Sequence, residues 1–500
     1  MTPDNSQIKL VFKNQTIFLT GATGFLGKVM IAKLLRDCED IKKIYILLRS
    51  KKGKNSEQRF EEIFEQPCFE FLKSKTSNWK EKVSVVEGDC EQPFLGISDD
   101  NLKILKNEVN FIIHLAANVR FDQSLKKAAN NVKCTADLLE LSKDIVNLKC
   151  FVLVSTAYSN SIHSHIKEEI YDPPIQPELL LSMVNGLDES VLTNLTPALL
   201  SKKWANTYVY SKCISEYLMK NATKHFPAAI VRPSIVMNSV REPESGWIDN
   251  IYGPIGLVIG VALGIIRTLH GDDKVSAHVV PVDYVCNCIL AAAWKTTKER
   301  KSNTKVFNYI GFQRKQLKWG ICILGQFGSY MNSLYWRMPP QDLIWYSDGK
   351  HHGKLYNQIH TFLLHTIPAY LIDAFLYCIG KPTIAVKAYA KIDKVLNLLS
   401  YFSTKNFDFD EHNVQDLWTE MNEDDKMFFN FSMEKLQWKN YFYTCVVGFR
   451  RYITKDPAIV STKTYVKLFT FMIAHYLVIA IFYYLLYKFV MFFFNFFWLN

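Results

Sequence analysis

The stretch TIFLTGATGFLGKVMIAKLLRD, residues 16–37, decides the fold. An apolar run at 16–20 leads into Gly21, Gly24 and Gly27, and a helical pattern of apolar residues follows. A glycine turn between a strand and a helix is typical of a dinucleotide site, where a pyrophosphate binds at the positive end of the helix. A glycine turn without a ligand is the alternative interpretation.

Further apolar runs follow at intervals that leave room for helices. We expect strands at residues 44–49, 83–89, 111–117, 151–157 and 228–236. This alternation predicts an α/β fold with a doubly wound parallel sheet. Beyond about residue 303 the alternation fades, and a mostly helical region is expected up to about residue 455.

A chain of 500 residues is too long for one compact core, so more than one domain is expected. We predict a dinucleotide-binding domain at 1–302, a connecting segment at 303–354, a helical domain at 355–455 and a membrane-anchoring tail at 464–500. The net charge of +11 comes from Lys and Arg interleaved with acids, and no basic block resembles a nucleic-acid motif. No nucleic-acid partner is therefore expected.

The cysteines indicate a reducing compartment. There are 11 of them, irregularly spaced and without a C-x-x-C pair, and the polar N-terminus does not resemble a signal peptide. Cys286 and Cys288 are expected to be buried packing, because no His or Cys cluster near them completes a tetrahedral set. We predict no metal site.

The tail carries an uncharged apolar stretch at 468–487, apart from His475, which is long enough to cross a bilayer. A buried core helix is the alternative. Five cations precede the stretch, namely Arg450, Arg451, Lys455, Lys463 and Lys467, and only Lys488 follows it. This bias places the preceding domains on the cytosolic side.

A second apolar segment at 360–380 contains a proline, an aspartate and two histidines, so a buried or interfacial helical hairpin is expected there rather than a span.

Tyr208 and Lys212 form a Y-x-x-x-K pair, whose spacing places both side chains on one helical face. A nearby ammonium would lower the pKa of the tyrosine, which could then act as a proton donor to the oxygen that gains charge as hydride arrives. Chance matches are frequent, but this pair lies downstream of the glycine turn and of Ser155 and Thr156, whose hydroxyls could hold a carbonyl oxygen. Of the two hydroxyls, we prefer Thr156.

Arg49 ends the expected second strand, where an NAD site commonly places an acid. A cation there favours the 2′-phosphate of NADPH, although a solvated loop residue would look the same.

Nearly the whole chain resembles the alcohol-forming fatty acyl-CoA reductases, the male-sterility-type branch of the extended short-chain dehydrogenases with a Rossmann fold. The resemblance rests on the motifs TGATGFLGKV, HLAANVRFD, NVKCT, VSTAYSN, NTYVYSK, VRPSIV, GWIDN, VPVDYV, LWTEMNEDDKMFFNF and WKNYF. It implies NADPH as cofactor, a long-chain acyl-CoA substrate and two hydride transfers that yield a primary alcohol. It also implies a tail in the membrane of the endoplasmic reticulum or the peroxisome, and it is compatible with a homo-oligomer.

The resemblance also implies roles for individual residues. The catalytic set would be Tyr208, Lys212, Thr156 and Ser155, with Asn131 supporting the proton path. The cofactor would contact Gly21, Thr23, Gly24, Phe25, Leu26, Gly27, Arg49, Asp89, Ala116, Ala117, Tyr208, Lys212, Pro233 and Ser234. A membrane-bound steroid or sugar dehydrogenase would use the same fold, and a catalytically silent scaffold is a third reading.

Overall fold

The computed structural model describes residues 5–51, 53–74, 77–201, 203–299, 303–311, 317–321, 330–347 and 351–498. Much of the expected connecting segment at 303–354 lies outside these residues. The chain forms two compact units, each assembled from separate stretches. Unit 1 comprises residues 1–249, 276–317 and 405–445, and unit 2 comprises 250–275, 318–404 and 446–500.

Unit 1 is built on a seven-stranded parallel sheet with the order β12-β7-β5-β4-β1-β2-β3. Its strands are β1 (Thr16–Thr20), β2 (Lys43–Leu48), β3 (Val83–Glu87), β4 (Phe111–His114), β5 (Cys150–Val154), β7 (Ala228–Pro233) and β12 (Lys305–Tyr309). The strand order reverses between β1 and β4, which is where doubly wound sheets bind ligands. The doubly wound parallel sheet is thus confirmed, and β12 is a strand that the apolar pattern did not predict.

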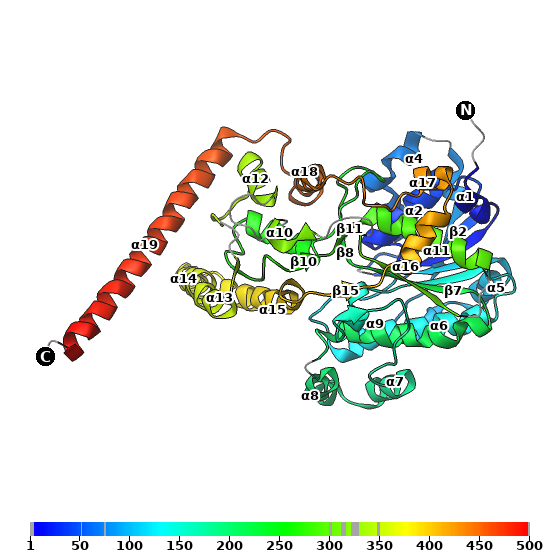
Figure 1. Ribbon diagram of the computed structural model, residues 1–500, viewed down its shortest axis with the longest axis horizontal. Helices are drawn as coiled ribbons and strands as arrows, with labels where there is room; N and C mark the ends of the chain where they lie inside the picture. Colours follow the sequence, from blue (N-terminus) through cyan, green and yellow to red (C-terminus); the bar gives the residue numbers. More distant parts are fainter. Residues whose placement is uncertain are drawn as a thin grey trace. The chain divides into compact units, whose positions relative to one another are not determined.

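Helices cover both faces of this sheet, with α2 and α11 on one face and α6 and α9 on the other (Figure 1). The helices of unit 1 are α1 (Gln7–Phe12), α2 (Phe25–Asp37), α3 (Ser56–Phe64), α4 (Glu70–Ser74), α5 (Asp99–Glu108), α6 (Leu125–Lys143), α7 (Pro177–Gly186), α8 (Glu189–Leu200), α9 (Thr207–Leu218), α11 (Val282–Glu299), α16 (His412–Glu420) and α17 (Glu423–Phe428). Cys286 and Cys288 are buried in α11, as the sequence predicted.

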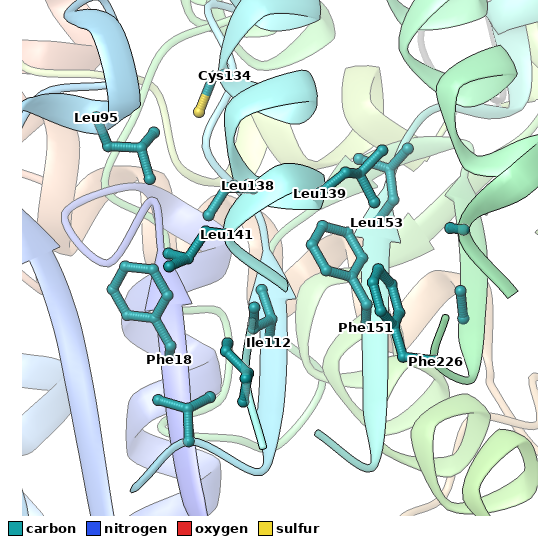
Figure 2. Close-up of a cluster of buried hydrophobic side chains, with 14 of the residues drawn as sticks. Phe18, Leu95, Ile112, Cys134, Leu138, Leu139, Leu141, Phe151, Leu153 and Phe226 are labelled. Carbon is teal, nitrogen blue, oxygen red and sulfur yellow. The ribbon is translucent and has the colours of Figure 1, made fainter. Parts of the chain in front are cut away.

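The main core lies between the sheet and α6. Phe18 of β1, Ile112 of β4 and Phe151 of β5 face Leu138 and Leu141 of the helix (Figure 2). Burial of these side chains between the sheet and the helix stabilises the fold by about 25 cal/mol for each Å² of apolar surface that is removed from water.

The segment 405–445 completes unit 1. Its strand β15 (Asp408–Phe409) pairs in parallel with β6 (His165–Ile166), and α16 packs on β12. Asp425 in α17 accepts hydrogen bonds from the Ser6 hydroxyl at 2.6 Å and from the Ile8 amide at 3.0 Å. The compact units are therefore discontinuous in sequence, whereas the predicted domain ranges are continuous.

Unit 2 is mostly helical. It contains α10 (Pro254–Ala262), α12 (Tyr330–Arg337), α13 (Lys354–Thr361), the π-helical turn η7 (Phe362–Thr366), α14 (Ile367–Cys378), α15 (Ala385–Ser403), the π-helical turn η8 (Phe449–Thr454) and α19 (Thr462–Trp498), and α18 (Trp438–Gly448) leads into it. Two of its helical stretches, Lys354–Cys378 and Thr462–Phe494, are long and apolar enough to cross a membrane.

Candidate active site

The glycine turn between β1 and α2 requires residues without a side chain. Gly21 has a φ of +80°, and a Cβ there would lie 2.7 Å from the backbone nitrogen of Ala116, just beyond β4. A Cβ at Gly27 would lie 2.2 Å from the carbonyl oxygen of Gly21. Both approaches are too close for any other residue, so the turn folds only with glycine at these places. Thr23, Phe25 and Leu26 lie half-buried in this turn.

Helix α2 begins here without a side-chain cap. Gly24 is its N-cap, and the Gly24 amide donates to the Gly21 carbonyl at 3.0 Å. The amides of the first helical turn have no intrahelical acceptor, and they carry the positive end of the helix dipole. An exposed glycine cap lets an anion approach these amides closely, so the residues fit the pyrophosphate of a dinucleotide. Ala116 and Ala117 follow β4 beside the turn.

A group of charges follows β2 and β3. The Arg49 guanidinium lies 2.8 Å from the Asp89 carboxylate and 3.3 Å from Glu91, and the hydrogen bond to Asp89 raises the pKa of Arg49. Arg59 of α3 donates to the Arg49 carbonyl at 2.5 Å. Burial, followed by the charge of Arg49, lowers the pKa of Arg59. Two arginines thus lie beyond β2, and the sequence pattern had indicated only the first.

Helix α9 carries Tyr208 and Lys212. Its N-cap is Asn206, whose side chain accepts from the Val209 amide at 3.0 Å. The buried ammonium of Lys212 donates to the Val154 carbonyl at the end of β5, at 2.8 Å. Burial lowers the pKa of Lys212 to about 8, although the Glu216 carboxylate acts in the opposite direction.

The Tyr208 hydroxyl behaves differently from the sequence-based expectation. Burial raises the pKa of Tyr208, and the Glu216 carboxylate raises it further. This direction is opposite to the predicted lowering by Lys212, because desolvation disfavours the charged phenolate and the Lys212 ammonium is bonded to the Val154 carbonyl. A tyrosine with a raised pKa stays protonated at neutral pH and can donate its proton.

The hydroxyls beyond β5 and β7 are not equivalent. The Thr156 hydroxyl accepts from the Tyr158 amide at 3.3 Å. Among the described residues, the buried hydroxyls of Ser155 and Ser234 have no hydrogen-bond partner. Ser234 follows Pro233 at the end of β7, and its amide donates to the Tyr309 carbonyl at 3.0 Å. A buried hydroxyl without a partner is costly, so Ser155 and Ser234 are available to a ligand.

Asn131 of α6 connects two elements of the site. Its side-chain nitrogen donates to the Ser211 hydroxyl at 3.0 Å, and its side-chain oxygen accepts from the Asn118 amide at 2.9 Å. Ser211 lies between Tyr208 and Lys212 on α9, so Asn131 ties α6 to the helix that carries both. The sequence reasoning missed Ser211, although it stands inside the Y-x-x-x-K motif.

His114 is a second residue that the sequence reasoning missed, although it begins the HLAAN motif. Its ring nitrogens lie 2.7 Å from the Thr20 hydroxyl and 3.3 Å from the Thr135 hydroxyl. Burial and then the charge of Lys212 lower the pKa of His114 to about 3. A neutral imidazole therefore stands behind the β1 and β4 ends of the site.

Comparisons with known proteins show which family this chain belongs to. A profile of the family described as "Male sterility protein" matches residues 19–289, and a second profile with the same description matches residues 364–456. The chain is 37% identical over 485 residues to the fatty acyl-CoA reductase wat of Drosophila melanogaster, covering 96% of this chain and 92% of the relative. The chain belongs to the male-sterility family of fatty acyl-CoA reductases.

Another relative and two solved structures are also similar to this chain. Fatty acyl-CoA reductase 1 of Rattus norvegicus is 34% identical over 89% of this chain and 86% of its own length. The terminal R domain of the myxalamid biosynthetic pathway has a TM-score of 0.58 at 19% identity, with 88% of this chain and 91% of that domain covered. A reductase domain of a non-ribosomal peptide synthetase from Mycobacterium tuberculosis has a TM-score of 0.56 at 17% identity, with 90% and 96% covered. The last two likenesses support the fold, and the family assigns a nicotinamide cofactor.

Proposed function

We propose that this protein reduces long-chain fatty acyl-CoA to a primary fatty alcohol and releases CoA. The reaction takes two hydrides from two NADPH and two protons, and it passes through an aldehyde. The observation that carries the proposal is the bond from the Lys212 ammonium, one helical turn from Tyr208, to the Val154 carbonyl, which precedes Ser155 and its hydroxyl without a partner among the described residues, in a member of this family.

The cofactor is proposed to be NADPH because two arginines lie beyond β2. The glycine turn and the first turn of α2 would hold the pyrophosphate. Arg49 and Arg59 would hold the 2′-phosphate, since guanidinium groups bind phosphate through paired hydrogen bonds. Asp89 would lie near the adenine, and Pro233 and Ser234 near the nicotinamide. The bound nicotinamide supplies the hydride.

The side chains of α9 and β5 would handle the oxygen and the proton. The hydroxyls of Ser155 and Thr156 would donate hydrogen bonds to the carbonyl oxygen as it gains negative charge. Tyr208, protonated at neutral pH, would give its proton to the alkoxide of the second reduction. Lys212 would hold the cofactor ribose, and Asn131 with Ser211 would keep α9 in place during proton return.

We propose that α19 anchors the protein in a membrane with the catalytic part in the cytosol. Arg450 does not contribute to the charge bias, because it is buried and donates to the carbonyls of Met338, Pro339 and Pro457. Arg451, Lys455, Lys463 and Lys467 still precede the span, and Lys488 follows it. The membrane is proposed to be that of the endoplasmic reticulum or the peroxisome.

The start of α19 is packed on protein. Leu468 is buried with Leu343 and Tyr346, and the Trp345 ring nitrogen donates to His475 at 3.2 Å. The part of α19 proposed to enter a bilayer thus begins beyond Tyr476, whose ring contacts Tyr346, and 477–498 would extend for about 33 Å, enough for a hydrocarbon core of about 30 Å.

The test is gas chromatography of lipids after the membrane fraction has been incubated with NADPH and acyl-CoA of several chain lengths. Fatty alcohol should form, and the Tyr208→Phe protein should form it about 10²–10⁴ times more slowly while it still binds NADPH. Tyr210→Phe, two residues along the same helix, is the matched control and should keep most of the activity.

Normal alcohol formation by Tyr208→Phe would contradict the assigned role. Turnover of a steroid or a nucleotide sugar, without thioester reduction, would favour a different short-chain dehydrogenase. Failure to bind any nicotinamide cofactor would favour a silent scaffold.

A further inference from the structure

The helix formed by α13, η7 and α14, residues Lys354–Cys378, buries two polar side chains, His365 and Asp373. Buried His365 accepts from the Arg267 amide at 3.0 Å and lies 3.3 Å from the Asp393 carboxylate. Asp373 accepts from the amides of residues 384–386 at 2.8–2.9 Å, which caps α15. The positions 365, 369 and 373 are spaced four residues apart and form one helical face that is packed within unit 2.

The other face of this helix is apolar and exposed. Leu355 is 73% exposed, Phe362 58%, Leu371 65% and Phe375 64%. The π-helical turn adds one residue to the helix between Phe362 and Ile367, so the side chains before and after it share one face. A helix in water places its apolar face inward, and a continuous exposed apolar face marks a binding surface.

The segment that contains this surface is cationic. The segment 353–404 contains five lysines (Lys354, Lys381, Lys387, Lys391 and Lys394) and two aspartates, so its formal net charge is +3. Both aspartates are engaged by protein groups, Asp373 by backbone amides and Asp393 by His365. Exposed Tyr356, Tyr370 and Tyr377 accompany the lysines. Tyrosines and lysines around an apolar face are typical of helices that lie at a membrane surface with anionic lipids.

The surface is continuous with the proposed membrane anchor. The Tyr356 hydroxyl of α13 lies 3.2 Å from the Tyr483 hydroxyl of α19, and both belong to unit 2. Beyond residue 476 most apolar side chains of α19 are exposed. A bilayer around this part of α19 would therefore also meet α13.

We propose that the exposed face of Lys354–Cys378 is a second membrane-contact site, which lies in the boundary between the headgroups and acyl chains of an anionic bilayer. The helix does not cross the bilayer, because its inward face carries His365 and Asp373 in contacts with Arg267, Asp393 and the start of α15. Together with α19 it fixes the orientation of unit 2 at the membrane. This inference does not depend on the acyl-CoA chemistry.

The experiment uses the full chain in nanodiscs of phosphatidylcholine and phosphatidylserine. A nitroxide label is attached to Leu371→Cys or Phe375→Cys in a chain that also carries Cys378→Ser, since Cys378 is exposed. Power saturation then compares collisions with oxygen, which concentrates in lipid, and with a water-soluble nickel chelate. Val146→Cys, exposed in unit 1, is the aqueous control, and Leu485→Cys in α19 is the control for the anchor. The signal of the chain with Cys378→Ser alone is subtracted as background.

Positions 371 and 375 should give an oxygen-to-nickel ratio several-fold above that of position 146, and removal of phosphatidylserine should lower it. A water-like ratio at both positions would overturn the proposal. Protection from both reagents, with spin–spin broadening, would also overturn it and indicate a second copy of this chain on the surface. Position 485 tests the anchor separately, and alcohol formation tests the proposed reaction separately.

Discussion

The carboxyl edge of the seven-stranded sheet is built in two different ways. Beyond β1 and β2, the first amides of α2 lack a side-chain cap and Arg49 is partly exposed. Near the carboxyl ends of β7 and β12, Arg232 within β7 is fully buried and donates to Glu216, Asn308 and the carbonyls of Lys167 and Glu169. Polar groups left accessible at a sheet edge are available to a ligand, and polar groups bound on every side stabilise the fold.

The largest expected effect is a loss of stability at the end of the sheet edge formed by β7 and β12, which we call the buried end. Arg232→Met leaves the Glu216 carboxylate buried without its guanidinium, which should lower the free energy of unfolding by about 3–5 kcal/mol. Arg49→Met, which removes a partly exposed ion pair, should cost at most about 1 kcal/mol. The measurement is urea unfolding of the full chain in detergent, followed by circular dichroism. An equal decrease in the free energy of unfolding of the two variants would contradict the proposed difference between the β7–β12 end and the β1–β2 end of the sheet edge.

The double variant Arg232→Met/Glu216→Leu sharpens this test. Because it removes both charges, it should regain much of the stability that Arg232→Met loses. No recovery would show that the hydrogen bonds of Arg232 to carbonyl groups, rather than its pairing with Glu216, dominate.

The second effect is a change in cofactor affinity at the end of the sheet edge formed by β1 and β2, which we call the accessible end. Arg49→Ala or Arg59→Ala should raise the KM for NADPH by about 10-fold or more, because each removes a charged hydrogen bond worth about 1.5–3 kcal/mol to the 2′-phosphate. The KM for NADH, which lacks this phosphate, should change little. Lys54→Ala is the matched control, since Lys54 is exposed and paired with Glu62. Equal losses with both cofactors would assign the two arginines to the fold instead of to the phosphate.

The two ends also differ in how far the sequence predicted them. The glycine turn and the Y-x-x-x-K pair depend on local spacing, so their positions could be read from the chain. The strand β12 was not predicted because its five residues include the polar Lys305 and Asn308, and the Asn308 side chain accepts from Arg232 at 3.3 Å. Arg59 was not predicted as a site residue, because its proximity to Arg49 depends on the path of α3 and not on local sequence spacing. The interaction of segment 405–445 with the sheet depends on contacts between residues more than 100 positions apart, such as the Asn413 side chain and the Val306 carbonyl at 2.8 Å.

The smallest expected effect concerns pH at the buried end. Glu168 accepts from the amides of Asn308 and Asn413, and burial raises its pKa to about 7. Burial and then the charge of Glu168 raise the pKa of Glu411 to about 8. The folded state therefore binds protons that the unfolded state releases near pH 4.5, so this contribution is fully present below that pH and is lost as the pH rises through 7 to 8.

Glu411→Gln should remove part of this loss, because an amide keeps the shape of the protonated carboxyl and never becomes charged. The variant should unfold with a free energy on the order of 1 kcal/mol higher than the unmodified chain at pH 8, and the difference should shrink toward pH 5. Urea unfolding at several pH values measures this, with the exposed Glu423→Gln as control. If the difference in free energy of unfolding between the variant and the unmodified chain did not vary with pH, Glu411 would be ionised in the folded state throughout this range. Burial at the β12 end of the sheet would then not raise the pKa of Glu411.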